Sequence, residues 1–81
     1  MNFIRTGPNS ACCEKVEVKI AKRDQLQYIE NNNTTTVPIE IGVDKVIDIA
    51  ISQIPFSKRQ EVKKDIDQAM DFLSIPHRFD I

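Results

Sequence analysis

Residues 43–54, VDKVIDIAISQI, followed by Pro55, are the stretch on which the fold prediction depends. The apolar residues recur at intervals of three and four, at Val43, Val46, Ile47, Ala50, Ile51 and Ile54. This spacing places one apolar stripe along an α-helix. Proline ends such a helix because it has no amide hydrogen and its ring clashes with the preceding turn. The pattern therefore predicts a helix that ends before Pro55.

A second helix is predicted directly after this proline. Ser57 and Gln60 have the spacing of a capping box, in which both side chains satisfy amides at the start of a helix. The apolar residues that follow share one stripe, namely Val62, Ile66, Ala69, Met70 and Leu73. Two helices joined by so short a connection run antiparallel. Residues 43–75 are therefore predicted to form a helical hairpin, and residues 76–81 to form a tail.

The first half of the chain predicts strands. Residues 16–21 and residues 25–29 alternate apolar and polar side chains, which is the period of a half-buried strand, and the simplest arrangement pairs them as a hairpin. Residues 31–36, NNNTTT, contain no apolar residue and predict a solvent loop. Residues 37–41 predict a short third strand, confined to a sheet edge by Pro38.

Residues 1–15 are predicted to be an irregular arm, because Gly7, Pro8, Asn9 and Ser10 lie together in it. Residues 1–81 are then one α+β domain, in which a short antiparallel β-hairpin or small sheet (16–41) precedes the helical hairpin. A chain of 81 residues closes only a thin core, and the two apolar stripes need a further partner. We therefore expect a homo-oligomer.

Composition excludes several classes of protein. Eleven Lys and Arg residues against twelve Asp and Glu residues leave no basic field for nucleic acid or an acidic membrane. No apolar run reaches membrane length, and the first residues do not resemble a signal peptide. We expect a cytoplasmic protein that binds neither nucleic acid nor membranes.

The residues that usually carry catalysis or metal binding are sparse. Cys12 and Cys13 are adjacent, which disfavours both a disulfide between them and a structural zinc site. They are interpreted as reduced thiols near the start of a strand. His77 is the sole histidine and lies far along the chain from both. We predict no catalytic residues, no metal site and no cofactor, and hence a protein that is not an enzyme.

Asp67 and Asp71 lie one helical turn apart in the predicted second helix, and such a pair can hold a cation. Lys63 and Lys64 lie one turn before them. This order of charges favours a salt-bridged, solvent-exposed helix face over a cation site.

The polar cluster that most suggests a ligand is Ser57-Lys58-Arg59, followed by Lys63 and Lys64. It lies at the predicted start of a helix, where free backbone amides and the helix dipole favour an anion. The lysine and arginine side chains add mobile cations. The cluster therefore predicts a site for a phosphate-bearing ligand, with ordinary solubilising charge as the alternative.

The same region resembles a known domain. Residues 42–59, which include PFSKR at 55–59, and residues 66–73, IDQAMDFL, are similar to the helical hairpin shared by phage anti-CBASS and anti-Thoeris sponge proteins. The resemblance implies a non-enzymatic oligomer that sequesters a cyclic nucleotide immune signal, either a cyclic oligonucleotide or a cyclic ADP-ribose variant. If the chain is phage-encoded, it would act in the cytoplasm of the host cell.

The resemblance also implies a ligand site. Arg59 matches the turn arginine of the family and would contact phosphate, helped by Lys58 and Ser57. Phe56 would offer its ring to a base, and Lys63 completes the predicted ligand-binding set. The alternative is a small protein-binding inhibitor or regulator that acts through its strands or through the apolar tail residues Ile75, Phe79 and Ile81.

Overall fold

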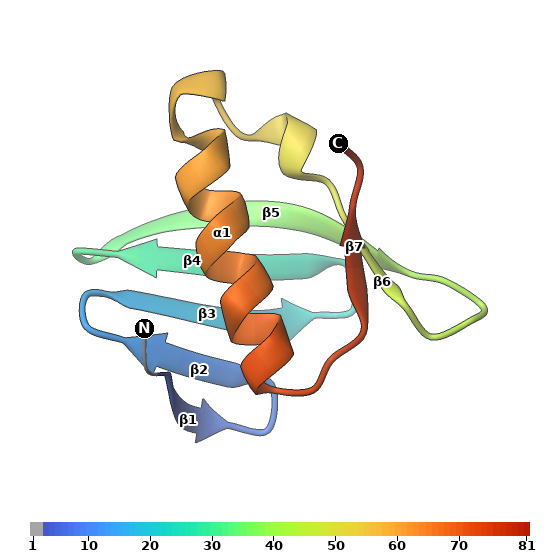
Figure 1. Ribbon diagram of the computed structural model, residues 1–81, viewed down its shortest axis with the longest axis horizontal. Helices are drawn as coiled ribbons and strands as arrows, with labels where there is room; N and C mark the ends of the chain where they lie inside the picture. The colour runs from blue at the N-terminus through green and yellow to red at the C-terminus, as the bar shows by residue number, and fades with distance from the viewer. Residues whose placement is uncertain (1–2) are drawn as a thin grey trace.

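The computed structural model describes residues 3–81 and consists of a curved sheet crossed by one long helix (Figure 1). The elements in chain order are β1 (Ile4–Gly7), β2 (Ser10–Cys13), β3 (Val16–Lys22), β4 (Gln25–Glu30), β5 (Asn33–Ile41), β6 (Ile47–Ile49), the 3₁₀ turn η1 (Ile51–Gln53), α1 (Phe56–Phe72) and β7 (His77–Phe79). The strands follow one another in the sheet in chain order. All neighbours pair antiparallel except β6 and β7, which are parallel.

The predicted hairpin of residues 16–29 is present as β3 and β4, with Val18 opposite Tyr28 and Ile20 opposite Leu26. The prediction that residues 31–36 form a loop holds for Asn31 and Asn32 and is wrong from Asn33 on. Asn31 and Asn32 both have positive φ and make a two-residue turn, after which β5 begins at Asn33. Asparagine tolerates this left-handed backbone, and two such residues match the twist of a hairpin. The threonines that follow are β-branched and favour a strand.

The prediction of an irregular arm over residues 1–15 is wrong from Ile4 onward, and residues 1–2 lie outside the described part. β1 and β2 form a further hairpin around Pro8 and Asn9. Ala11 and Cys13 point into the core while Cys12, between them, is partly exposed. The sequence did not predict β2 because its buried and exposed side chains alternate over only four residues, directly after a cluster of turn-forming residues. β5 is also not an edge strand, because it pairs with β4 on one side and β6 on the other.

The predicted helical hairpin of residues 43–75 is wrong, because its first helix does not exist. Residues 47–49 form β6, and η1 provides a single turn. Ile47 and Ile49 are buried, whereas Val43 is fully exposed, so the burial follows a period of two rather than the helical stripe. Ile39 and Ile41 of β5 pair with these two isoleucines, and the sheet thus captures a segment whose local spacing also fits a helix.

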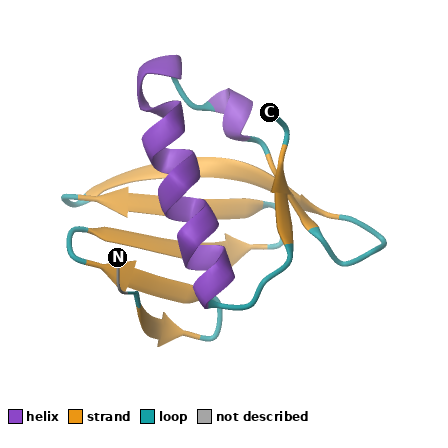
Figure 2. Cartoon of the chain, in the orientation of Figure 1, coloured by secondary structure: helices purple, strands orange, loops and turns teal. Residues whose placement is uncertain are grey.

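The predicted second helix is present as α1, and Figure 2 shows it lying across the strands as the one long helix of the described chain. Pro55 is its N-cap residue and no side chain caps it, so the capping box of Ser57 and Gln60 is not formed. The predicted stripe is the buried one: Val62, Ile66, Ala69, Met70 and Leu73 are at most 6% exposed. They share the core with Val18, Leu26 and Val37 of the sheet.

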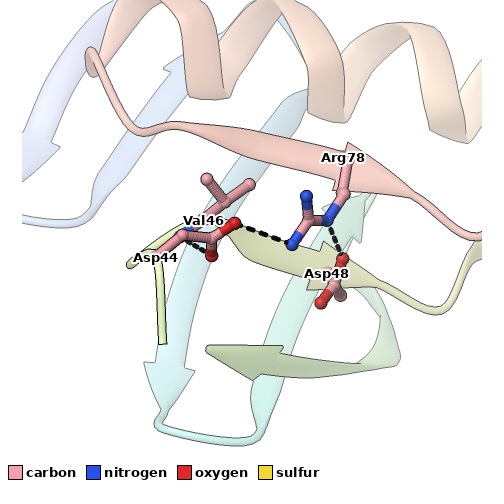
Figure 3. Close-up of polar contacts among 4 residues, drawn as sticks. All are labelled: Asp44, Val46, Asp48 and Arg78. Atoms are coloured by element: carbon pink, nitrogen blue, oxygen red, sulfur yellow. Dashed lines mark hydrogen bonds and ion pairs between the residues drawn. The ribbon is translucent and has the colours of Figure 1, made fainter. Parts of the chain in front are cut away.

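The C-terminal strand β7 is held by an ionic clamp shown in Figure 3. Arg78 donates from Nη2 to Asp44 Oδ2 at 3.1 Å and from Nε to Asp48. Asp44 Oδ1 also accepts from the amide of Val46, and this hydrogen bond together with Arg78 lowers the pKa of Asp44. A Cβ on Gly42 would lie 2.8 Å from Asp44 Oδ1, so glycine leaves room for the carboxylate.

Within residues 3–81 there is no helix with the length and apolar character needed to cross a membrane.

Candidate functional site

The best-formed concave site lies between the start of α1 and the β4–β5 hairpin, and we call it the helix-start groove. Its volume is about 350 Å³. The sheet contributes Tyr28, Glu30, Asn33 and Thr35, and the segment around the start of α1 contributes Ile54, Pro55, Ser57, Lys58, Glu61 and Val62. An apolar wall with several converging polar groups, at a volume above about 300 Å³, is typical of small-molecule sites.

The floor of the groove is a buried hydrogen bond. Tyr28 Oη donates to Asp65 Oδ2 at 2.6 Å, and the two residues are 3% and 5% exposed. Tyr28 points inward because it shares the core face of β4 with Leu26, two residues before it. Asp65 lies among the buried residues of α1. Burial, followed by the bond to Asp65, raises the pKa of Tyr28 well above its usual range. The phenol therefore stays neutral and fixed in place.

The rim carries charges of both signs. Lys58 supplies one cation, while Glu30 and Glu61 supply two carboxylates that also face Tyr28 closely enough to raise its pKa. The first turn of α1 contains no acidic residue and has no capping side chain. Its free amides therefore add positive potential beside Lys58 and the Ser57 hydroxyl. The groove is suited to a ligand that carries an anionic group, for Lys58 and the first turn of α1, next to hydrogen-bond donors, for the carboxylates of Glu30 and Glu61.

The structure divides the predicted ligand-binding residues. Ser57 and Lys58 line the groove, but Phe56, Arg59 and Lys63 do not. Arg59 donates to the carbonyl oxygens of Ser52 and Ile54, and its guanidinium carbon lies 5.5 Å from the centre of the Phe56 ring. Arg59 thus holds the turn that leads into α1.

Lys63 lies on another face of α1. Its Nζ donates to the carbonyl oxygen of Ile81 at 2.9 Å and lies 5.3 Å from the centre of the Phe79 ring. It therefore contacts the C-terminal tail. The separation follows from helix geometry, because five residues from Lys58 to Lys63 correspond to about 140° of rotation.

Sequence reasoning missed the groove residues Tyr28, Glu30, Asn33, Thr35 and Glu61, and also Asp65 below them. One signal for Asp65 was present. It falls three residues after Val62 and four before Ala69, on the apolar stripe, where an acidic residue needs a buried partner. Nothing local marked the sheet residues, because their approach to α1 depends on the curvature of the sheet.

Three other depressions are less suitable as sites, and the one of about 380 Å³ between α1 and Phe79 is lined by Gln60, Lys63, Lys64 and Asp67. One of about 280 Å³ lies between β5 and β6 and is mostly apolar, and one of about 380 Å³ lies beside Cys12 at the β3 end of the sheet. All three are more open to solvent than the helix-start groove. The helix-start groove is therefore the most enclosed of these four depressions.

No family model, no curated protein and no solved structure matches this chain. The described residues form a small curved sheet with one covering helix and a groove at the start of that helix.

Proposed function

We propose that this chain is a non-enzymatic binding protein that holds a small nucleotide-type ligand in the helix-start groove. The observation that carries the proposal is the position of Ser57 and Lys58, which lie in an uncapped first helical turn and face a groove of about 350 Å³. A phosphate group fits this turn, since the amides, the hydroxyl and the ammonium group all donate to it.

The two carboxylates narrow the ligand class. Glu30 and Glu61 accept hydrogen bonds from hydroxyl or amino groups, which a nucleotide carries on its sugar and its base. They also repel a second phosphate close to the first. A cyclic oligonucleotide, whose phosphates are separated by sugars that carry hydroxyl groups, therefore fits better than a ligand with adjacent phosphates, such as a linear polyphosphate or cyclic ADP-ribose.

We propose a binding protein and not an enzyme because of the groups that line the groove. The Tyr28 hydroxyl is committed to Asp65 and has a raised pKa, so it is a poor nucleophile. His77 and the two cysteines do not line the groove. Among the described residues of the groove, no base is paired with a nucleophile.

The proposed biological role is sequestration of a cyclic nucleotide immune signal, by a cyclic oligonucleotide- or cyclic ADP-ribose-binding oligomer in the cytoplasm of a phage-infected cell. This part of the proposal is supported by the resemblance of residues 55–59 and 66–73 to the sponge proteins. The support is confined to the turn and to α1, because the first helix of the hairpin is absent.

The first test is calorimetric titration with cyclic dinucleotides and with cyclic ADP-ribose, combined with amide NMR shifts. We expect shifts at Ser57, Lys58 and Thr35. Replacement Lys58→Ala should weaken binding by about tenfold or more, because a hydrogen bond to a charged group contributes about 1.5–3 kcal/mol.

The matched control is Lys63→Ala, which removes the same charge from the same helix but on the face that contacts the tail. Binding should be unchanged in this variant. Equal weakening by both replacements, or shifts outside the groove, would show that the ligand binds by general charge and that the groove is not the site.

A second function, a small protein-binding regulator, is favoured by a specific observation. Ile41, the last residue of β5, is 48% exposed, and Val43, in the loop between β5 and β6, is fully exposed. Ile81, at the C-terminal end, is 58% exposed. Native mass spectrometry of protein purified from its cells separates the two functions. A co-purifying nucleotide supports the first, and a ligand-free chain that carries a stoichiometric protein supports the second.

A further inference from the structure

A cluster of potential metal ligands lies on the face of α1 opposite the groove. Asp67 and Asp71 are one helical turn apart, and His77, the first residue of β7, lies beside them. Asp67, Asp71 and His77 each offer one ligand atom, and these atoms all lie within 4.8 Å of one another. Both aspartates are exposed, so solvent ions reach them.

The imidazole of His77 is held in one orientation. Its side chain is only 7% exposed, its Nδ1 lies 2.8 Å from the carbonyl oxygen of Ile75, and its Nε2 lies 2.6 Å from Asp67 Oδ1. A carbonyl oxygen only accepts hydrogen bonds, so Nδ1 carries the hydrogen. Histidines that bind metals usually donate their second ring nitrogen to such a carbonyl or to a carboxylate.

The contact between Nε2 and Asp67 Oδ1 needs a positive charge, which either a second ring proton or a metal ion supplies. In a neutral imidazole the single ring hydrogen would be the one that Ile75 accepts, and Nε2 and Oδ1 would then face each other with lone pairs. The contact is favourable only when a second proton or a metal ion lies there. In the ion pair of His77 with Asp67 a second ring proton lies there, and a metal ion bound by Nε2 and the two carboxylates would take the place of that proton.

The lysines do not supply this charge. The ion pairs of residues 3–81 join His77 to Asp67 and Arg78 to Asp44 and Asp48, and none joins Lys63 or Lys64 to Asp67 or Asp71. Lys63 is bound instead to the carbonyl oxygen of Ile81. The salt-bridged helix face expected from the spacing of these charges is therefore not what the structure contains.

We propose that Asp67, Asp71 and His77 form a binding site for a divalent transition-metal ion, of which Zn²⁺ fits best. One imidazole nitrogen and two carboxylate oxygens are common ligands of Zn²⁺, and three protein ligands leave a coordination position open for water or another molecule. The imidazole favours Zn²⁺ over Mg²⁺ and Ca²⁺, which prefer oxygen ligands alone. This site is independent of the helix-start groove.

The test is calorimetric titration of the full chain with Zn²⁺, under reducing conditions and after removal of metals by a chelator. His77 is the sole histidine, so its two ring ¹⁵N signals report the site without ambiguity. We expect one ion per chain, a large shift of Nε2, and retention of the hydrogen on Nδ1. Mg²⁺ at the same concentration should leave both signals in place.

The discriminating variant is Asp71→Asn. Its carboxylate makes no hydrogen bond or ion pair with residues 3–81, so the change removes a ligand and leaves the packing intact. Zn²⁺ affinity should fall by at least about tenfold, the loss seen even when an outer partner of a ligand is removed. Asp24→Asn, an equal change of charge in the turn between β3 and β4, should leave the affinity unchanged.

The proposal is overturned if Zn²⁺ leaves the ring nitrogens of His77 unshifted, which includes binding only through Cys12 and Cys13. It is also overturned if Asp71→Asn and Asp24→Asn bind Zn²⁺ as tightly as the unmodified chain. The ¹⁵N shifts of His77 are measured on the unmodified chain, so the first of these two outcomes does not depend on the folding of any variant.

Discussion

The two sides of α1 are stabilised by different kinds of contact. On the groove side, the Tyr28–Asp65 hydrogen bond is buried beneath the site. On the tail side, which comprises residues 75–81 and the segments that they contact, several polar contacts join exposed groups, as in Lys63 to Ile81 and Ser52 of η1 to Asp80. A buried bond is hard to break without loss of the fold, whereas exposed polar contacts respond to pH, salt and ions. The groove is therefore built to be rigid, and the tail side is built to respond to its surroundings.

The largest effect should come from the residue that supports both sides. Ile66 is fully buried between Asp65 on the groove side and Asp67 on the tail side. Ile66→Ala should lower the free energy of unfolding by about 2–5 kcal/mol, through lost burial and the cavity left behind. Urea denaturation followed by circular dichroism measures this.

The exposed replacement Gln60→Ala on the same helix is the control and should change the free energy of unfolding by no more than about 0.5 kcal/mol. A loss below about 1 kcal/mol in Ile66→Ala would contradict the packing of α1 on the sheet described above.

The second effect concerns the groove side alone. Tyr28→Phe removes the hydroxyl and leaves the Asp65 carboxylate buried without its partner, so unfolding should become easier by about 1–3 kcal/mol. The double variant Tyr28→Phe/Asp65→Leu should recover much of this loss, because the unpaired group is gone. Denaturation of the two single variants and the double variant gives the coupling energy. Strictly additive losses would mean that the hydrogen bond does not form in solution.

The smallest effect concerns the pH response of the tail side. Hydrogen bonds from Ser52 lower the pKa of Asp80 below its ordinary value of 3.8. A carboxyl whose pKa is lower in the folded state stabilises the fold above the unfolded pKa, and this stabilisation is lost as the pH falls through the folded value. Stability should therefore decline on acidification below about pH 4, and Asp80→Asn should remove that part of the decline.

This last change should be small because Asp80 is exposed and solvent screens it. A ¹³C titration of the Asp80 carboxyl group measures the pKa directly. A titration at the ordinary value would mean that the tail is not tied to Ser52.

Sequence patterns predicted an element correctly where its apolar side chains followed a single period, either that of a strand or that of a helix. For the strands it also mattered that the pairing strand was the next one in the chain. The alternation of Val18 and Ile20 against Leu26 and Tyr28 identified β3 and β4 because a tight turn brings them together. The stripe of α1 was correct because its period of 3.6 extends over about three turns, from Val62 to Leu73. Short strands such as β1 and β2 were missed because four residues contain too little alternation to outweigh a cluster of turn formers.

The candidate site was predicted in part. Ser57 and Lys58 were identified because a helix start with basic residues is visible locally. Arg59 and Lys63 were grouped with them by proximity in the chain, but the structure directs the first to the carbonyl oxygens of Ser52 and Ile54 and the second to the tail.

The sequence by itself determined α1, its buried stripe and the central hairpin, since these depend on side-chain period and on neighbours in the chain. Only the tertiary structure decided the state of residues 43–54. Ile47 and Ile51 fit the helical stripe and also, together with Ile49, a strand alternation, and the choice was made by β5 and β7, which pair with β6 from either side. The same holds for both proposed sites. Tyr28 meets Asp65 across 37 positions of the chain, and His77 meets Asp67 only because the parallel strand β7 returns beside α1. Contacts between distant segments follow from the closure of the whole fold and leave no local pattern.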